Sequence, residues 1–267
     1  MSSKLTGFFN KLRRAKQAFL NDPSPDPGAV YDCPVCGAVQ VKMHPVSAYY
    51  FGNWQKYQTI HNPVFIETMN LAHYMCARCF SFDRERLYAL YLKEYFCNRQ
   101  PVSLLDIAPG KALKRFLKNY PQVIYRSMDL EREDVDDRFD ITDMKGYKDE
   151  QFDFFICSHV LEHIPDDIKA MQELHRVLKK GGKGIAMVPI SLQLEKTMED
   201  PGCTDEAMRW KYFFQNDHVR MYAKEDFINR LRSVGFTVEQ LGIDHFSREV
   251  FEKNAISPTS VLYVVSK

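Results

Sequence analysis

From residue 102 onward, short apolar runs alternate with amphipathic segments, and this alternation constrains the fold more than any other feature of the chain. Strands are expected over 102–107, 123–128, 152–157, 183–188, 237–243 and 261–265. Helices are expected over 83–99, 111–119, 167–179 and 224–234, with Gly181 and Gly182 capping the third. The alternation predicts an α/β fold with a parallel sheet covered on both faces, and with ligands at the carboxyl ends of the strands.

Four of the seven cysteines form two Cys-x-x-Cys pairs, Cys33 with Cys36 and Cys76 with Cys79. Two such pairs supply the tetrahedral sulfur set of a structural zinc, whereas a redox pair needs no second one. Four thiolates leave no position for a substrate, so we expect the metal to stabilise the fold. This use of cysteine also favours a reducing, cytoplasmic location over a disulfide framework.

Composition excludes several classes of protein. The chain has 36 Lys+Arg, 35 Asp+Glu and 45% hydrophobic residues, which argues against disorder and against a general attraction to nucleic acid. No apolar run approaches the roughly 20 residues of a membrane span, so we expect neither a span nor secretion.

Three segments are predicted. Residues 1–28 form an amphipathic helix and a Pro-rich linker, which either packs on the body or lies on a membrane surface. Residues 29–82 form a zinc-ribbon-like module, and residues 83–267 form the α/β domain.

Acidic residues stand at three successive strand ends. Asp106 begins a turn that leads through Gly110 into a helix, Asp129 follows the next strand 23 residues later, and Asp140 precedes the strand after that. A first turn of this kind, followed by an acid near that spacing, is typical of sites that bind an adenosine-containing cofactor. Helix capping is the alternative for Asp106 and Asp140.

Two further motifs follow these acids. The strand expected at 152–157 leads through Ser158 into His159-Val160-Leu161-Glu162-His163, and the next helix ends in Arg-Val-Leu-Lys-Lys-Gly-Gly at 176–182. Together the motifs resemble the class I S-adenosylmethionine-dependent methyltransferases over about residues 102–266, specifically the type 11-like bacterial subgroup with an N-terminal cysteine-rich module. The first motif departs from the usual Asp-x-Gly-x-Gly by having Pro109 before Gly110. The resemblance implies a Rossmann-like, seven-stranded, mostly parallel sheet.

The resemblance also implies roles for the strand-end residues. Asp106 would orient the methionine amino group, Asp129 would hold the ribose, Asp140 and the Ile141 amide would read the adenine, and His159 would lie near the sulfonium. The implied cofactor-binding set is Asp106, Ala108, Pro109, Gly110, Asp129, Leu130, Asp140, Ile141, Thr142, Ser158 and His159.

The long polar segment over 189–222 follows the fifth strand, where such enzymes build the acceptor pocket. In it, His218 stands beside Asp217 and two residues before Arg220, so it can take a proton from an acceptor hydroxyl while the arginine binds an anionic group. We take His218, Asp217, Arg220 and His159 as the catalytic candidates. The alternative is a hydrogen-bonded lid that only shapes the site.

The His-x-x-Glu-His pattern at 159–163 also occurs in certain zinc peptidases. There both histidines lie on one helix, whereas here a strand precedes the motif and Pro165 precedes the next helix, so we reject that function.

Arg84 and Arg86 lie at the start of the helix expected over 83–99. They either reach the mouth of the acceptor pocket or form a solvated face.

The function we favour is O-methylation of a sugar or phosphorylated precursor of a bacterial surface polysaccharide. S-adenosylmethionine would be the cofactor, zinc would be structural, and the partner would be a small molecule. The alternatives are an RNA methyltransferase that holds RNA with the zinc module, and a non-catalytic cofactor-binding protein.

Overall fold

The computed structural model describes residues 28–97 and 101–267, so the helix expected near the N-terminus lies outside the described residues. A seven-stranded sheet forms its centre, with strand order β12-β13-β9-β8-β5-β6-β7. Its strands are β5 (Val102–Ile107), β6 (Val123–Asp129), β7 (Asp137–Arg138), β8 (Phe152–Ser158), β9 (Leu178–Met187), β12 (Thr237–Leu241) and β13 (Leu262–Ser266). The first five of these pair in parallel, whereas β13 runs antiparallel to both β9 and β12. The predicted mostly parallel, Rossmann-like sheet is confirmed.

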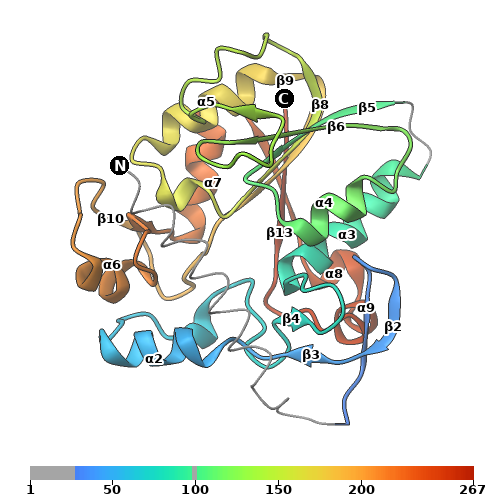
Figure 1. Ribbon diagram of the computed structural model, residues 1–267. Helices are drawn as coiled ribbons and strands as arrows, with labels where there is room; N and C mark the ends of the chain where they lie inside the picture. Colours follow the sequence, from blue (N-terminus) through green and yellow to red (C-terminus); the bar gives the residue numbers. More distant parts are fainter. Residues whose placement is uncertain (1–27, 98–100) are drawn as a thin grey trace.

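Helices cover both faces of this sheet (Figure 1). Helices α3 (Asp83–Phe96) and α4 (Lys111–Leu117) lie on one face, and α5 (Asp167–Val177) and α7 (Lys224–Ser233) lie on the other. The chain crosses between faces where β5 neighbours both β6 and β8. The carboxyl ends of these three strands therefore flank a switch point, where ligands of such sheets bind.

The predicted glycine cap after α5 is wrong. The helix ends at Val177, because Leu178 is already extended and pairs with Phe152 of β8. Gly181 and Gly182 lie within β9, at an irregularity of its pairing with β8, and the amide of Gly181 donates to the carbonyl of Lys267. Hydrogen bonding to the C-terminal strand region thus replaces the cap that the local pattern indicated.

The remaining elements lie below the sheet and beside it in Figure 1. They are β1 (Tyr31–Cys33), β2 (Ala38–Val41), β3 (Met43–His44), α2 (Ala48–Lys56), η1 (Pro63–Phe65), β4 (Met75–Cys76), η2 (Leu161–His163), β10 (Met198–Glu199), α6 (Glu206–Phe213), β11 (Arg220–Met221), α8 (Ile243–Phe246) and α9 (Arg248–Lys253).

The cysteine-rich part packs against the rest of the chain. Cys33, Met43 and Cys76 belong to the same hydrophobic core as the sheet. A second cluster joins Trp54 of α2 to Trp210 of α6 and to neighbouring apolar side chains. The part of the chain before α3 therefore shares its packing with the sheet domain.

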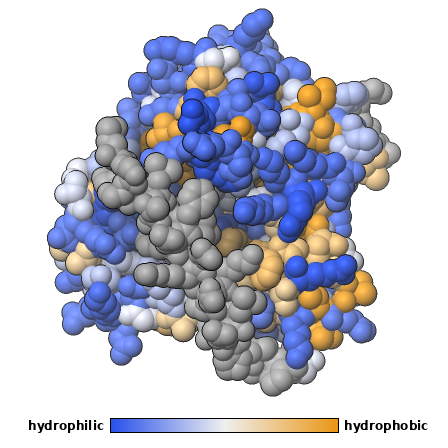
Figure 2. Space-filling view, in the orientation of Figure 1, coloured by the Kyte–Doolittle hydropathy of each residue, from blue (hydrophilic) through white to orange (hydrophobic). Residues whose placement is uncertain are grey.

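The surface is mainly polar. The face in Figure 2 is largely hydrophilic, and its hydrophobic residues gather in separate small groups. None of the helices in the described ranges combines the length and the apolar character needed to cross a bilayer.

Candidate active site and metal centre

The turn after β5 has the geometry of a ligand-binding loop. Ala108 adopts a left-handed conformation with φ of +51°, and Gly110 provides the N-cap of α4. A Cβ on Gly110 would lie 2.5 Å from Oε1 of Glu85, so a side chain there would force the buried glutamate to move. Sequence reasoning had missed Glu85, which α3 brings to this turn and which carries no local motif.

Asp106 is the penultimate residue of β5 and is buried, at 1% exposure. The Tyr125 hydroxyl donates a 2.8 Å hydrogen bond to Oδ2 of Asp106. The pKa of Asp106 is raised to about 7, mainly by burial; the hydrogen bond from Tyr125 opposes this shift and the neighbouring Glu85 adds to it. A buried carboxyl of this kind gains a great deal from a cationic ligand, and the α-ammonium of a methionine moiety provides one.

The two other strand-end acids hold turns. Oδ1 of Asp129 accepts hydrogen bonds from the amides of Glu131 and Arg132, at 2.9 and 3.1 Å. Oδ1 of Asp140 accepts from the amide and the hydroxyl of Thr142, both at 2.8 Å. Neither acid is the N-cap of α4 or α5, whose N-caps are Gly110 and Asp166.

The neighbours of these acids differ in exposure. Leu130 is 58% exposed, whereas Ile141 is buried at 4%. The carbonyl of Pro109 accepts a 2.6 Å hydrogen bond from Arg132, which links the first turn to the second. The residues predicted to bind the cofactor thus lie on adjoining loops at one edge of the sheet.

The end of β8 completes this edge. Ser158 Oγ lies 2.8 Å from the hydroxyl of Tyr88 on α3, and the next residue, His159, has a left-handed φ of +54°. Its amide donates to the carbonyl of Met187 at the end of β9. Such a conformation costs a residue with a side chain some free energy, and here it turns the chain sharply at the end of β8.

A cluster of imidazoles surrounds the buried side chain of Glu162 in η2. Nδ1 of His159, Nε2 of His163 and Nε2 of His218 lie 3.4, 3.8 and 3.9 Å from Glu162 Oε1. Glu162 is fully buried, and burial raises its pKa to about 7, while His163 and Arg84 lower it. Burial and the nearby Arg84 hold the pKa of His159 well below its ordinary range, so its ring is neutral.

The candidates from the polar segment have two different positions: two of them lie at the imidazole cluster, and the third binds a neighbouring loop. His218 is 1% exposed and belongs to the cluster, and the main-chain carbonyl of Asp217 lies 3.3 Å from Nδ1 of His163. Arg220 is equally buried, but its guanidinium donates to the carbonyls of Leu161, Ile164 and Pro165 and to Glu199. Arg220 therefore holds the loop after β8 in place, and the anion-binding role expected for it is not supported by these contacts.

Arg84 and Arg86 are not a solvated face. The guanidinium of Arg86 is fully buried and donates to the carbonyls of His73, Tyr74, Asn254 and Ala255. Arg84 lies close enough to the cluster to influence His159 and Glu162. Its Nη1 donates to the Tyr74 hydroxyl at 3.1 Å, and its buried Nε has no hydrogen-bond partner among the described residues. Tyr50 of α2 lies near Arg84, Tyr74 and Asp217, so the segment between the two cysteine pairs borders the cluster.

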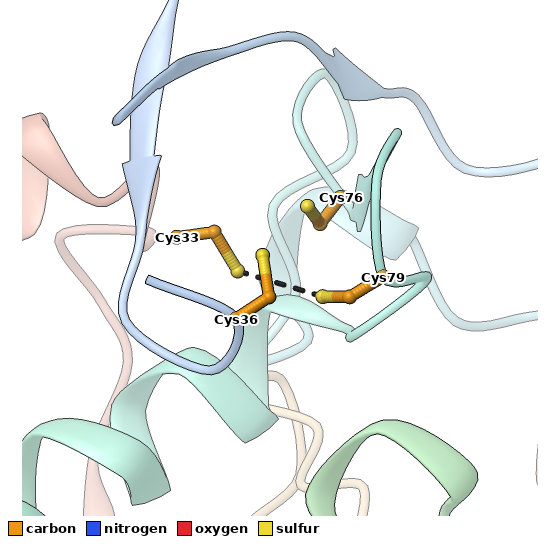
Figure 3. Close-up of side chains that lie close together, drawn as sticks. All are labelled: Cys33, Cys36, Cys76 and Cys79. Carbon is orange, nitrogen blue, oxygen red and sulfur yellow. Dashed lines mark hydrogen bonds between the residues drawn. The ribbon is translucent and has the colours of Figure 1, made fainter. Parts of the chain in front are cut away.

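The four predicted metal ligands converge (Figure 3). The sulfurs of Cys33, Cys36, Cys76 and Cys79 all lie within 4.8 Å of one another, and those of Cys33 and Cys79 are 3.7 Å apart. Sulfurs bound to a zinc at about 2.3 Å are separated by about 3.8 Å in a tetrahedron, which agrees with that distance. Hydrogen bonds from Cys76 and Cys79 lower the pKa of Cys33, which favours a thiolate in the cluster.

Both cysteine pairs have the same backbone turn. The amide of Gly37 donates to the carbonyl of Cys33, and the amide of Phe80 donates to that of Cys76, each at 2.9 Å. Gly37 and Phe80 both have a left-handed φ, of +69° and +64°. This repeated knuckle fits a four-thiolate metal site, although glycine follows only the first pair.

Comparison with known proteins identifies the larger part of the chain. The model of a family described as "Methyltransferase domain" matches residues 80–241. A curated relative, the uncharacterized protein MJ1123 of Methanocaldococcus jannaschii, is 36% identical over 91 residues, and the match covers 34% of this chain and 40% of the relative. The chain thus spans less than half the length of that relative.

Solved structures with a similar arrangement include two from other organisms. One, from Archaeoglobus fulgidus, is described as a SAM-dependent methyltransferase and has a TM-score of 0.45 at 14% identity, covering 68% of this chain and 94% of that one. Another, from Bacillus halodurans, is described as a putative methyltransferase and has a TM-score of 0.42 at 15% identity, covering 66% and 96%.

Proposed function

The chain belongs to the methyltransferase domain family as an S-adenosylmethionine-dependent methyltransferase, and on that premise we propose that it methylates a hydroxyl oxygen of a small, sugar-like acceptor. The acceptor class we favour is a sugar or phosphorylated precursor of a bacterial surface polysaccharide.

The observation that carries this proposal is the imidazole cluster around Glu162, beside the loops assigned to the cofactor. When bound, S-adenosylmethionine supplies a methyl group that is already activated by its sulfonium. An amine or thiolate can attack such a methyl group unaided, whereas a hydroxyl has to lose its proton as it attacks. The neutral imidazole of His159, in a cluster with two further imidazoles at this position, therefore supports a hydroxyl acceptor.

The residues have separate tasks in the transfer. Asp106 and Asp129 would hold the methionine and ribose ends of the cofactor, and the end of β8 would position the acceptor oxygen towards the methyl group. S-adenosylmethionine would supply that methyl group, and the sulfur, which becomes a neutral thioether, would be the leaving group. The hydroxyl proton passes to an imidazole of the cluster, for which His218 is the first candidate and His159 the second.

Arg84 supports a phosphorylated acceptor. Its unpartnered Nε lies in the region of Tyr50, Tyr74 and the cluster, where a phosphate oxygen would satisfy it. Arg84 thus takes the anion-binding role that the sequence suggested for Arg220.

A panel of acceptors tests the proposal. Purified protein is incubated with S-adenosylmethionine and with sugars, sugar phosphates, nucleotide sugars or RNA oligonucleotides, and release of S-adenosylhomocysteine is measured. We expect turnover with a member of the sugar classes. Arg84→Met should raise the KM for its phosphorylated form at least about tenfold and leave the parent sugar unaffected, whereas the exposed Arg232→Met should change neither.

Two results would contradict the proposal. Turnover on RNA alone would assign the chain to the RNA methyltransferases, and tight S-adenosylhomocysteine binding without turnover on any acceptor would indicate a non-catalytic protein. An equal effect of Arg84→Met on phosphorylated and parent acceptors would remove the phosphate-binding role of Arg84.

A further inference from the structure

Three side chains from two distant segments meet at the carboxyl end of β8. Oε1 of Glu162 and ring nitrogens of His163 and His218 all lie within 4.8 Å of one another. We infer that Glu162, His163 and His218 bind a divalent transition-metal ion, at a site separate from the four cysteines. This inference deepens the proposed function, on which its role in catalysis rests.

The first observation concerns Glu162, whose carboxylate is fully buried. Neither of its oxygens receives a hydrogen bond from another residue that the structure describes. Removing a carboxylate from water without a hydrogen bond or a cation is costly, so buried carboxylates are paired or bind metals. Glu162 faces imidazoles at distances of 3.4 to 3.9 Å, which are too long for hydrogen bonds.

The second observation is the orientation of the two imidazoles. Nδ1 of His218 lies 2.8 Å from the carbonyl oxygen of Phe213, and Nδ1 of His163 lies 3.3 Å from that of Asp217. In each ring Nδ1 therefore carries the hydrogen and donates it to the main chain, which makes Nε2 the nitrogen with a lone pair. Both Nε2 atoms face Glu162. Metal-binding histidines are held in this way by outer carbonyl or carboxylate groups.

The spacing fits an ion in the middle. Ligand atoms bound at about 2.1 Å are separated by about 3.4 Å in a tetrahedral site. The distances of 3.8 and 3.9 Å from Glu162 Oε1 to the two Nε2 atoms come close to that value before any adjustment of the side chains. Two imidazoles with one carboxylate suit Zn²⁺, Fe²⁺, Co²⁺ or Mn²⁺ and leave positions open for a substrate oxygen.

The site explains the His-x-x-Glu-His pattern without a peptidase helix. The motif follows a strand, and its last three residues form a single turn of 3₁₀ helix. This turn brings the side chains of Glu162 and His163 to the proposed metal site, and the loop before β11 contributes His218. An ion here would bind the acceptor hydroxyl and lower its pKa. His159, at 3.4 Å from Glu162, would then be the imidazole that takes the proton.

Metal binding is tested on the full-length protein with its cysteine site loaded with zinc. Mn²⁺ is the probe, because it competes poorly for thiolates and its electron paramagnetic resonance spectrum reports imidazole and carboxylate ligands. We expect one Mn²⁺ per chain beyond the zinc. Glu162→Gln and His163→Gln should each weaken Mn²⁺ binding by about 10²-fold or more, while the exposed His245→Gln leaves it unchanged.

Co²⁺ gives an independent readout. Bound at this site it shows ligand-field bands without the intense thiolate-to-cobalt charge transfer that a cysteine site produces. Thermal unfolding and S-adenosylhomocysteine affinity are measured on every variant, and His163→Gln, at a partly exposed position, decides the matter if Glu162→Gln does not fold.

The outcomes separate the inference from the proposed function. Saturable Mn²⁺ or Co²⁺ binding that depends on Glu162 and His163 supports the metal site, even if no acceptor is methylated. No saturable binding of Mn²⁺, Co²⁺ or additional Zn²⁺ by the wild type, or binding that survives both substitutions, overturns it. In that case a proton shared by Glu162 and the imidazoles neutralises the cluster, and methyl transfer can still occur.

Discussion

The buried carboxyl of Asp106 should make cofactor binding depend on pH. Its pKa is raised from an ordinary value of 3.8 to about 7. If Asp106 holds the cofactor's ammonium group, as we propose, only its ionised form would pair with that group. With that pKa, about 3% of Asp106 is ionised at pH 5.5 and about 90% at pH 8. The affinity for S-adenosylhomocysteine should therefore fall by about 30-fold between pH 8 and pH 5.5.

Stability should change in the opposite direction. Because the folded-state pKa of Asp106 is raised, its stabilising contribution is full below pH 4 and is lost as the pH rises to 7. A rise from 3.8 to about 7 corresponds to about 4 kcal/mol, so Asp106→Asn should stabilise the cofactor-free protein at pH 8 and leave it nearly unchanged at pH 4. The cofactor's ammonium would offset this cost in the complex.

Titration calorimetry from pH 5.5 to 8, together with thermal unfolding, tests both statements. Tyr125→Phe removes the hydroxyl that donates to Asp106 and so should move the midpoint of the affinity curve to higher pH. Tyr120→Phe removes a hydroxyl elsewhere and serves as the control. The reasoning would be refuted if the affinity for S-adenosylhomocysteine did not vary with pH, or if it varied equally in Asp106→Asn and in the wild type. If the pH dependence were lost only in Glu85→Gln, it would belong to Glu85, the second buried carboxyl.

Three other predictions concern the zinc, the ribose and the base. Purified protein should contain about one tightly bound zinc per chain. Cys76→Ser should lose the zinc and lower the unfolding temperature, whereas the exposed Cys97→Ser should do neither. A protein that is free of metal and whose stability does not change with chelators would contradict this prediction. Asp129→Ala should weaken S-adenosylhomocysteine binding at least about tenfold by calorimetry, through the loss of charge-assisted hydrogen bonds, and an unchanged affinity would rule out its ribose role; the exposed Asp244→Ala is the control. His218→Ala should lower turnover about 10² to 10⁴-fold with S-adenosylhomocysteine affinity nearly unchanged, and near-normal turnover with a raised KM would make His218 an acceptor-binding or lid residue.

The sheet could be predicted from the sequence because its strands carry their own signal. β5 begins and ends at the predicted residues, and β6 and β8 each extend one residue further than expected. Parallel strands buried on both faces are continuous apolar runs, and few other structures produce them. The glycine pair at 181–182 was misread, because its role depends on pairing with the C-terminal residues and not on its neighbours in sequence.

The acceptor side could be predicted only in part. His218, Asp217 and His159 were expected and do lie near one another, but Glu162 and His163 were considered only as part of a peptidase motif. Arg220 has the charge of a ligand-binding residue, and its use as a scaffold follows from carbonyls contributed by a loop more than 50 residues away. Contacts of this kind leave no periodic pattern in the sequence.

The spacing of the two cysteine pairs acquires a meaning once the fold is known. Met43 of β3 pairs with Cys76 of β4, so the intervening segment is closed at its base beside the four sulfurs. From this loop, Trp54 of α2 stacks on Phe214 at a centroid distance of 4.4 Å and donates to its carbonyl. The residue before Phe214 supplies the carbonyl that orients the His218 ring. A metal held by the cysteines would therefore stabilise the loop that carries Trp54. Through the contact of Trp54 with Phe214, it would also help to hold the neighbouring segment that we place beside the acceptor. The same segment orients the ring of His218, which we propose as the base or as a metal ligand.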